Sequence, residues 1–155
     1  MTIEYKIAIK EKPDTIAGII YIDPVMIARE KENPFKSPSR NYPVDFGVPF
    51  VEYYNLQLVI PEGYIVEELP QSKFLTLEDK GGQFQYGVSQ VGDKILVNFN
   101  FAINKPMFLP SEYLMLRSFY DLIINKEAEQ IVLKKKPIWY VQTVNPVVVR
   151  KFFTP

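Results

Sequence analysis

The chain has 155 residues, a length that suits one domain with a single hydrophobic core. Hydrophobic residues make up 47% and charged residues 23%, which excludes the composition of a disordered chain. The 18 basic residues balance the 18 acidic ones, so no net charge attracts nucleic acid or an anionic membrane surface.

The chain contains no histidine and no cysteine. Their absence excludes disulfides, thiolate or imidazole metal ligands, and catalysis by Ser-His-Asp or Cys-His groups. No apolar run reaches the roughly 20 residues of a membrane-spanning helix, and the first residues alternate like a strand rather than forming a signal peptide. We therefore expect a protein without catalytic residues, cofactor, metal or membrane span in this chain.

Short alternations of apolar and polar residues predict the first strands, at residues 3–9 and 18–23. The composition then changes between residues 30 and 50, where Pro34, Pro38, Pro43 and Pro49 oppose regular central strands and helices. The aromatic residues of this proline-rich connection predict that it packs against the rest of the protein; they are Phe35, Tyr42, Phe46 and Phe50.

The alternation is strongest in the middle of the chain. It predicts a strand over residues 54–60 that ends at a Pro-Glu-Gly turn, and further strands at residues 65–69 and 74–78. Residues 83–103 have the pattern of a hairpin, in which Gly92 and Asp93 form the turn and Gly92 takes the positive φ.

One helix is predicted at residues 112–127, because four apolar residues share a helical face and Ser111 is suited to the N-cap. These four residues are Leu116, Phe119, Tyr120 and Ile123. Residues 131–133 are apolar and lead into three lysines, which we interpret as a solvent-exposed end. The β-branched and aromatic residues 139–149 predict a last strand within a C-terminal extension, residues 137–155.

Seven or more short strands with turn residues between them are typical of a β-sandwich. We predict a mainly β fold over residues 1–155: a single immunoglobulin-like antiparallel β-sandwich with one amphipathic helix near residues 112–127.

Candidate catalytic groups are weak. Glu67-Glu68 and Glu78-Asp79 are the carboxylate pairs available for acid–base chemistry, but neighbours on a strand point to opposite faces. The glycines lack the spacing of phosphate-binding loops, and no segment repeats the oxygen ligands of a calcium loop.

Exposed aromatic side chains are the remaining candidates for a binding role, since their faces stack on sugar rings or insert into protein surfaces. In the pairs Tyr53-Tyr54 and Trp139-Tyr140, neighbours face opposite ways on a strand, so at least one residue of each pair is expected to be exposed. The candidate ligand or partner contacts are Tyr53, Trp139 and Tyr140.

Several separated motifs resemble one bacterial family: Asn33-Pro34-Phe35, Arg40 with residues 43–47, the run 60–70, residues 113–120 and residues 129–135. Over residues 18–135 the chain resembles the C-terminal domain of unknown function that follows a transglutaminase-like core in large exported bacterial proteins. The resemblance implies a β-sandwich accessory module of an exported protein, periplasmic for example. The cysteine, histidine and aspartate of the core would lie upstream, outside this chain.

Three functions follow from these observations. The first is a non-catalytic module that positions the transglutaminase-like core, or a partner of that protein. The second is a free-standing β-sandwich that binds carbohydrate or peptide through exposed aromatic residues. The third is a hydrolase that uses two facing carboxylates. We expect the first, with the upstream domain or another protein as partner.

Overall fold

In the computed structural model, the backbone is described for residues 2–5, 18–25, 31–136 and 148–154, and the side chains for residues 18–25 and 31–136. The strands are β1 (Thr2–Tyr5), β2 (Ile19–Ile22), β3 (Val44–Asp45), β4 (Phe50–Val59), β5 (Tyr64–Glu68), β6 (Lys73–Thr76), β7 (Gly82–Val91), β8 (Lys94–Ile103), β9 (Met107–Phe108), β10 (Ile131–Lys135) and β11 (Val148–Thr154). The helices are α1 (Tyr113–Glu127) and the two 3-10 turns Glu78–Lys80 and Pro110–Glu112.

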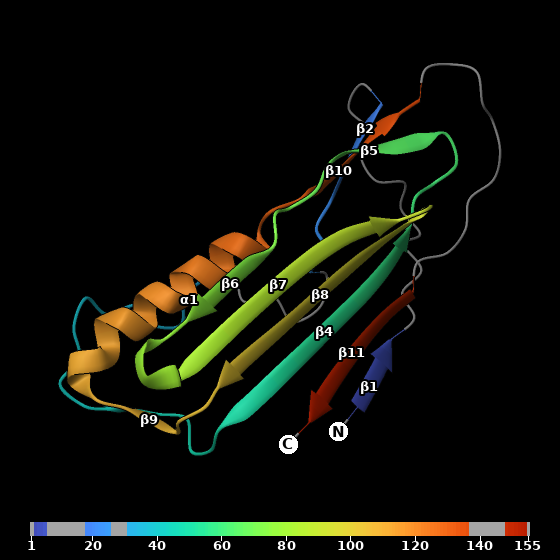
Figure 1. The fold of residues 1–155 in the computed structure, drawn as a ribbon. Helices are drawn as coiled ribbons and strands as arrows, with labels where there is room; N and C mark the ends of the chain where they lie inside the picture. Colours follow the sequence, from blue (N-terminus) through green and yellow to red (C-terminus); the bar gives the residue numbers. More distant parts are fainter. Residues whose placement is uncertain (1, 6–17, 26–30, 137–147, 155) are drawn as a thin grey trace.

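The largest layer is a six-stranded antiparallel sheet in the order β1-β11-β4-β8-β7-β6 (Figure 1). Its centre is the long β7–β8 hairpin, which confirms the hairpin expected from the alternating sequence. Gly92 begins the two-residue turn with φ 61°, the conformation that a glycine tolerates at this position of a hairpin. The first and last strands of the chain, β1 and β11, pair with each other at one side of this sheet.

Two smaller sheets complete the β-structure of the described residues. Strands β2, β10 and β5 form a three-stranded sheet in that order, and β3 pairs with β9. Strand β10 is the central strand of its sheet, although no strand was predicted at residues 131–135. The lysines at 134–136 are exposed, which confirms the expected solvent-exposed end. Ile131 and Leu133 are fully buried there, which shows that a run of three apolar residues suffices for a central strand when both neighbours supply backbone hydrogen bonds.

Helix α1 covers the core face of the large sheet with the four apolar residues that the sequence predicted. Phe119 and Tyr120 contact Phe101 of β8, with ring centroids 6.3 and 5.6 Å apart. Perpendicular or tilted ring pairs at these distances are favourable beyond the area that they bury. The sheet and the helix therefore share one aromatic core.

The helix begins differently from the prediction. Ser111 is not the N-cap, because it lies inside the 3-10 turn Pro110–Glu112 that precedes α1. The turn is closed by Glu112 instead: its Oε2 accepts a hydrogen bond from the backbone N–H of Leu109 at 2.7 Å, and its Oε1 pairs with Lys105. A carboxylate that reaches back three residues replaces the hydroxyl cap.

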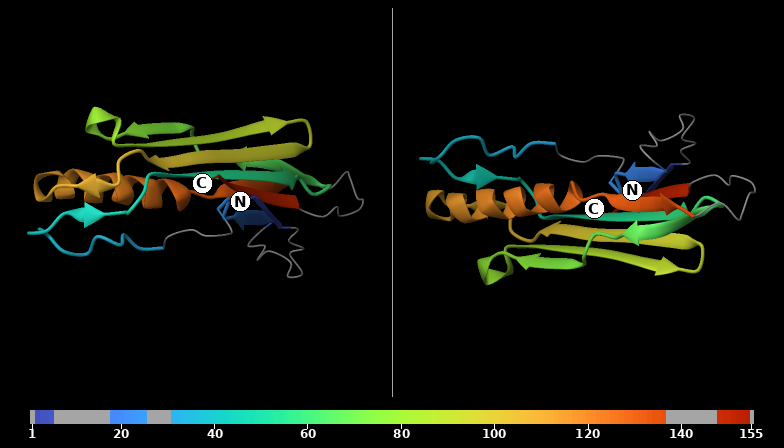
Figure 2. Two further views of the ribbon diagram at one scale, coloured as in Figure 1. Left: turned by 90° about the horizontal axis from the view of Figure 1, so that it is seen from below. Right: turned by 90° about the horizontal axis from the view of Figure 1, so that it is seen from above.

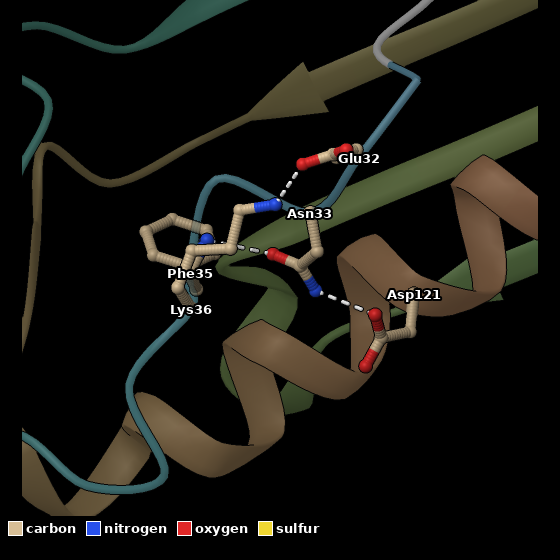
Figure 3. A network of polar contacts seen from close by, with 5 residues as sticks. All are labelled: Glu32, Asn33, Phe35, Lys36 and Asp121. Carbon is tan, nitrogen blue, oxygen red and sulfur yellow. Dashed lines mark hydrogen bonds and ion pairs between the residues drawn. The ribbon is translucent and has the colours of Figure 1, made fainter.

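The proline-rich segment, residues 31–49, lies on the other side of α1 from β6 and β7 (Figure 2). Asn33 attaches it to the helix: its Nδ2 donates to Asp121 and to the carbonyl of Arg117, both at 2.8 Å, and its Oδ1 accepts from the N–H of Phe35 (Figure 3). The Tyr113 hydroxyl donates to the carbonyl of Ser37 at 2.8 Å. These bonds confirm that the segment packs against the body.

Three of its four expected aromatic anchors reach the core. Phe35 is buried and meets Tyr120 edge-on at 4.9 Å, while Phe46 and Phe50 are partly buried against the core. Tyr42 is not an anchor, since 79% of it is exposed. It lies in the bend between Phe35 and Phe46, and the contact between those two rings attaches the segment to the core without Tyr42.

The mainly β class, with antiparallel sheets and one α-helix, is confirmed. The immunoglobulin-like arrangement of the strands stays a prediction. The strand expected at residues 74–78 ends at Thr76, because residues 78–80 form a 3-10 turn in which Asp79 and Lys80 have positive φ. Strand β11 lies partly within the expected C-terminal strand, most of which falls outside the described residues.

Replacing Phe35 with alanine tests the attachment of the proline-rich segment. The substitution removes three perpendicular ring contacts, to Phe46, Tyr113 and Tyr120, and should lower the free energy of unfolding by about 3 kcal/mol. Tyr42→Ala is the matched control in the same segment, and its effect should stay within about 0.5 kcal/mol. Urea denaturation measures both; equal losses would contradict the assignment of Phe35 as the anchor.

The Glu112 carboxylate predicts a dependence of stability on pH. The hydrogen bond from Lys105, and then that from Leu109, hold the pKa of Glu112 below its ordinary value. A lowered pKa in the folded state gives stability that is present above the ordinary value and lost as the pH falls through the lowered one. Glu112→Gln should therefore cost about 1 kcal/mol at pH 7 and flatten the acid side of the stability curve.

Urea denaturation between pH 7 and pH 3 checks this expectation. Glu78→Gln, in the other 3-10 turn, replaces an exposed carboxylate and serves as the control. If both variants keep the acid dependence of the parent chain, Glu112 is not the group responsible.

Candidate functional site

The residues of the large sheet that point away from its core form the outer face, defined on β4, β6, β7 and β8. Tyr53 lies on this face and is 39% exposed, whereas Tyr54 next to it is fully buried and stacks on Phe99. The alternation that predicted one exposed residue in this pair is thereby confirmed. The binding role of Tyr53 stays a prediction.

The strand register places Tyr53 in a row that runs across the sheet. Tyr53 is opposite Asn100, Asn100 is opposite Gln85, and Gln85 is opposite Phe74 of β6. Phe74 is 62% exposed, so the part of the row from β6 to β4 begins and ends with an aromatic residue. Beyond Tyr53 the register continues to Phe152 of β11. Phe74 and Tyr53 are three strand spacings of about 4.8 Å apart, which gives roughly 14 Å between their backbones perpendicular to the strands.

Amide side chains dominate the outer face between and around these rings. Six of them belong to the three long strands: Asn55, Gln57, Gln83, Gln85, Asn98 and Asn100. On the four strands that define the face, the only charged residue in this phase is Lys94, at the end of β8 next to the hairpin turn. The face therefore offers many neutral hydrogen-bond donors and acceptors and almost no charge.

Two of the amides are held close to the sheet. A Cβ atom on Gly87 would lie only 2.9 Å from Oδ1 of Asn98, its partner across the β7–β8 pair, so the glycine makes room for that amide. The Oδ1 atom of Asn100 is buried and has no hydrogen-bond donor among the described residues. A buried acceptor without a donor costs about 1–3 kcal/mol, so Asn100 is a position with unused hydrogen-bonding capacity.

A second feature is a groove of about 750 Å³ at the C-terminal end of α1. It lies between the helix end, the β5–β6 connection and the three-stranded sheet, and its lining includes the exposed side chains of Tyr21 and Leu122. Glu68 and Glu129 are among its carboxylates, and Glu129 pairs with Lys126 at 2.5 Å. The groove is thus part apolar and part polar, with at least one of its charges neutralised.

Lys126 beside this groove is 7% exposed and lies over the ring of Tyr86, with its Nζ 5.4 Å from the ring centroid. The Tyr86 hydroxyl is buried without a hydrogen-bond partner among the described residues. Burial, and then the charges of Glu129 and Glu127, raise the pKa of Tyr86 far above its ordinary value. The tyrosine is therefore neutral at any physiological pH and has no role as a base.

Tyr86→Phe tests the unpartnered hydroxyl. Because the substitution removes a buried polar group and keeps the ring, stability should rise by about 1 kcal/mol. Tyr54→Phe is the matched control: the Tyr54 hydroxyl donates to the carbonyl of Pro24 at 2.8 Å, and its loss should lower stability by about 1 kcal/mol. Thermal and urea denaturation measure both. A loss of stability in Tyr86→Phe would mean that its hydroxyl has a partner.

The expected carboxylate pairs do not come together as pairs in the structure. Glu67 forms an ion pair with Lys134 at 3.4 Å, while Glu68 lines the groove. Glu78 and Asp79 lie in an exposed 3-10 turn rather than on a strand. Among the described residues no group of three or more Asp or Glu side chains is arranged to hold a metal ion, and no helix is long and apolar enough to cross a membrane.

Two of the predicted contact residues, Trp139 and Tyr140, lie outside the described residues. The partners of Tyr53 on the outer face were not found from the sequence. Phe74 has a place in an alternating segment, but its position relative to Tyr53 depends on the pairing of β6 with β7, which no local pattern specifies. The amides themselves can be read from the sequence, because Asn and Gln occupy polar positions of the alternating pattern in β4, β7 and β8.

Comparison with known proteins gives a family and a fold. The family model of DUF3858, a domain of unknown function with a solved structure, matches residues 18–133. No curated protein matches the sequence. A crystal structure of a candidate protease from Parabacteroides distasonis is similar in fold, with a TM-score of 0.61 and 18% sequence identity over 76% of this chain. That similarity covers only 23% of the crystallised chain.

The motifs that suggested a domain of unknown function lie largely within the matched range, which covers more than half of the chain. The match concerns this domain alone and does not include a transglutaminase-like core. On the strength of the family match, the chain belongs to the DUF3858 family of domains of unknown function.

Proposed function

We propose that the chain is a non-catalytic accessory module of a larger exported bacterial protein with a transglutaminase-like core. The observation that carries the proposal is that the fold recurs as 23% of a much longer chain, a candidate protease. Interfaces between domains of one chain resemble those between separate proteins, so a module of this size within a longer chain has surface enough to position its neighbour. The resemblance of the motifs between residues 33 and 135 supplies the transglutaminase-like context.

The chemistry of the chain supports this division of roles. A transglutaminase-like core works through a cysteine, a histidine and an aspartate, and this chain contains neither cysteine nor histidine. The groove beside α1 holds the buried Lys126, but Glu129 neutralises it and the neighbouring Tyr86 does not ionise. These groups suit a fixed structural contact better than proton transfer.

The groove is the surface that we assign to the core. Tyr21 and Leu122 are 49% and 50% exposed and line the same concave region, so a protruding apolar side chain of a neighbouring domain would bury both. The paired charges at its border would form the polar rim that such interfaces have.

A binding experiment between two separately produced parts tests this function. The chain should bind the transglutaminase-like region of the same polypeptide, and Tyr21→Ser with Leu122→Ser should weaken that binding roughly tenfold or more, because both lose apolar contact area. Tyr42→Ser, at an exposed tyrosine that does not line the groove, should leave binding unchanged. Isothermal titration calorimetry measures the affinities.

Either of two outcomes would refute the proposal: a coding sequence without a transglutaminase-like region, or binding that the double substitution leaves intact while Tyr42→Ser reduces it. The second candidate function, binding of carbohydrate or peptide, is favoured by a different surface, the outer face with its amides and two aromatic rings.

A further inference from the structure

We propose that the outer face of the large sheet binds an extended neutral polysaccharide, which lies across the strands along the row from Phe74 to Tyr53. This surface is opposite to the core face that α1 covers. The inference does not depend on the proposed accessory role, since the groove and the outer face are built from different side chains.

The two exposed rings lie in one cross-strand row. Phe74 on β6 and Tyr53 on β4 are three strands apart in that row, roughly 14 Å by strand spacing, and the row continues past Tyr53 to Phe152 of β11. An extended chain of a few sugar rings is long enough to reach both. Aromatic faces offer such rings a flat apolar contact, and the Tyr53 hydroxyl adds a polar end.

Amide side chains lie between the two rings. Gln85 and Asn100 fill the row, and each amide provides two N–H donors and a carbonyl acceptor. Sugar hydroxyls both donate and accept, so they match amides without any need for charge. The buried Oδ1 of Asn100 has no donor in the described structure, and a ligand hydroxyl that reached it after a small side-chain shift would satisfy it.

Charge is sparse on the outer face. In the outward phase of β4, β6, β7 and β8 the only charged residue is Lys94, which lies at the far end of β8, and the register adds Arg150 of β11 opposite Asn55. An acidic polysaccharide would find no row of cations here. A folded protein partner would bury the amides in a dry interface, where each amide without a hydrogen-bond partner costs free energy. The centres of protein interfaces are instead rich in aromatic residues, methionine and arginine. A neutral, hydroxyl-rich chain is the ligand class that this face matches best.

A glycine keeps part of the outer face flat. Gly87 has no positive φ, so its backbone conformation does not require glycine. Its missing side chain leaves space for the amide of Asn98, whose Oδ1 would lie 2.9 Å from a Cβ atom at position 87. Gly87→Ala would displace only the end of a flexible side chain. The variant should therefore fold normally and raise the amide above the plane of the sheet.

Affinity electrophoresis of the full chain tests the proposal, with native gels that contain laminarin, mannan or hydroxyethyl cellulose as neutral probes and polygalacturonate as the acidic probe. At least one neutral probe should slow the chain. Tyr53→Ala and Phe74→Ala should each weaken that retention by roughly fivefold, the effect of losing one ring contact. Tyr53→Phe should keep most of it because the ring remains.

The controls use surfaces outside the row. Tyr42→Ala removes an exposed tyrosine of the proline-rich segment and should not change retention. Circular dichroism and thermal unfolding verify that all variants are folded, and the exposure of Tyr53 and Phe74 predicts that they are. Gly87→Ala should reduce retention without lowering stability.

Three outcomes would overturn the inference: no retention by any neutral probe, retention by polygalacturonate alone, or retention that the Tyr53 and Phe74 substitutions leave unchanged. None of them affects the accessory role, which is measured through the Tyr21 and Leu122 variants. Conversely, a chain without an attached core that still binds a neutral polysaccharide would favour the free-standing module.

Discussion

The contact between Phe101 of the large sheet and the aromatic residues of α1 holds the structure together. Phe119 and Tyr120 pack on Phe101 from the helix side, and Phe35 meets Tyr120 edge-on from the proline-rich segment. Each ring is thus shared by elements that are far apart in the sequence. Because the rings fill the core face of the sheet, the helix and the segment that crosses it cannot move independently of the strands.

This packing also decides which surface remains for binding. A sheet with an apolar core face and a polar outer face needs only one covering layer, and α1 with the three-stranded sheet provides it. The outer face then keeps its amides and the two rings of Tyr53 and Phe74. The groove at the end of α1 arises where the covering layer changes from helix to sheet. Two distinct surfaces therefore follow from one core.

The strongly periodic parts of the fold could be predicted from the sequence. In the hairpin at residues 83–103 and the helix at residues 112–127, apolar residues recur with the period of a strand or a helix along most of the element. The local sequence pattern therefore predicts both. Strand β10 was missed because its apolar run is short and lysines follow it. The exposure of Tyr53 could be predicted from alternation, but its row with Phe74 could not, because register between strands depends on tertiary pairing.

Hydroxyl-radical labelling followed by mass spectrometry tests the division between the two faces most directly. The buried Tyr54 follows Tyr53 on β4, and the buried Phe84 precedes Gln85, the residue paired with Phe74. Each exposed ring therefore has a buried ring nearby for comparison. The account predicts rapid oxidation of Tyr53 and Phe74 and protection of Tyr54 and Phe84 in the folded chain. Equal protection of Tyr53 and Tyr54 would contradict it, since the outer face would then be covered rather than free to bind.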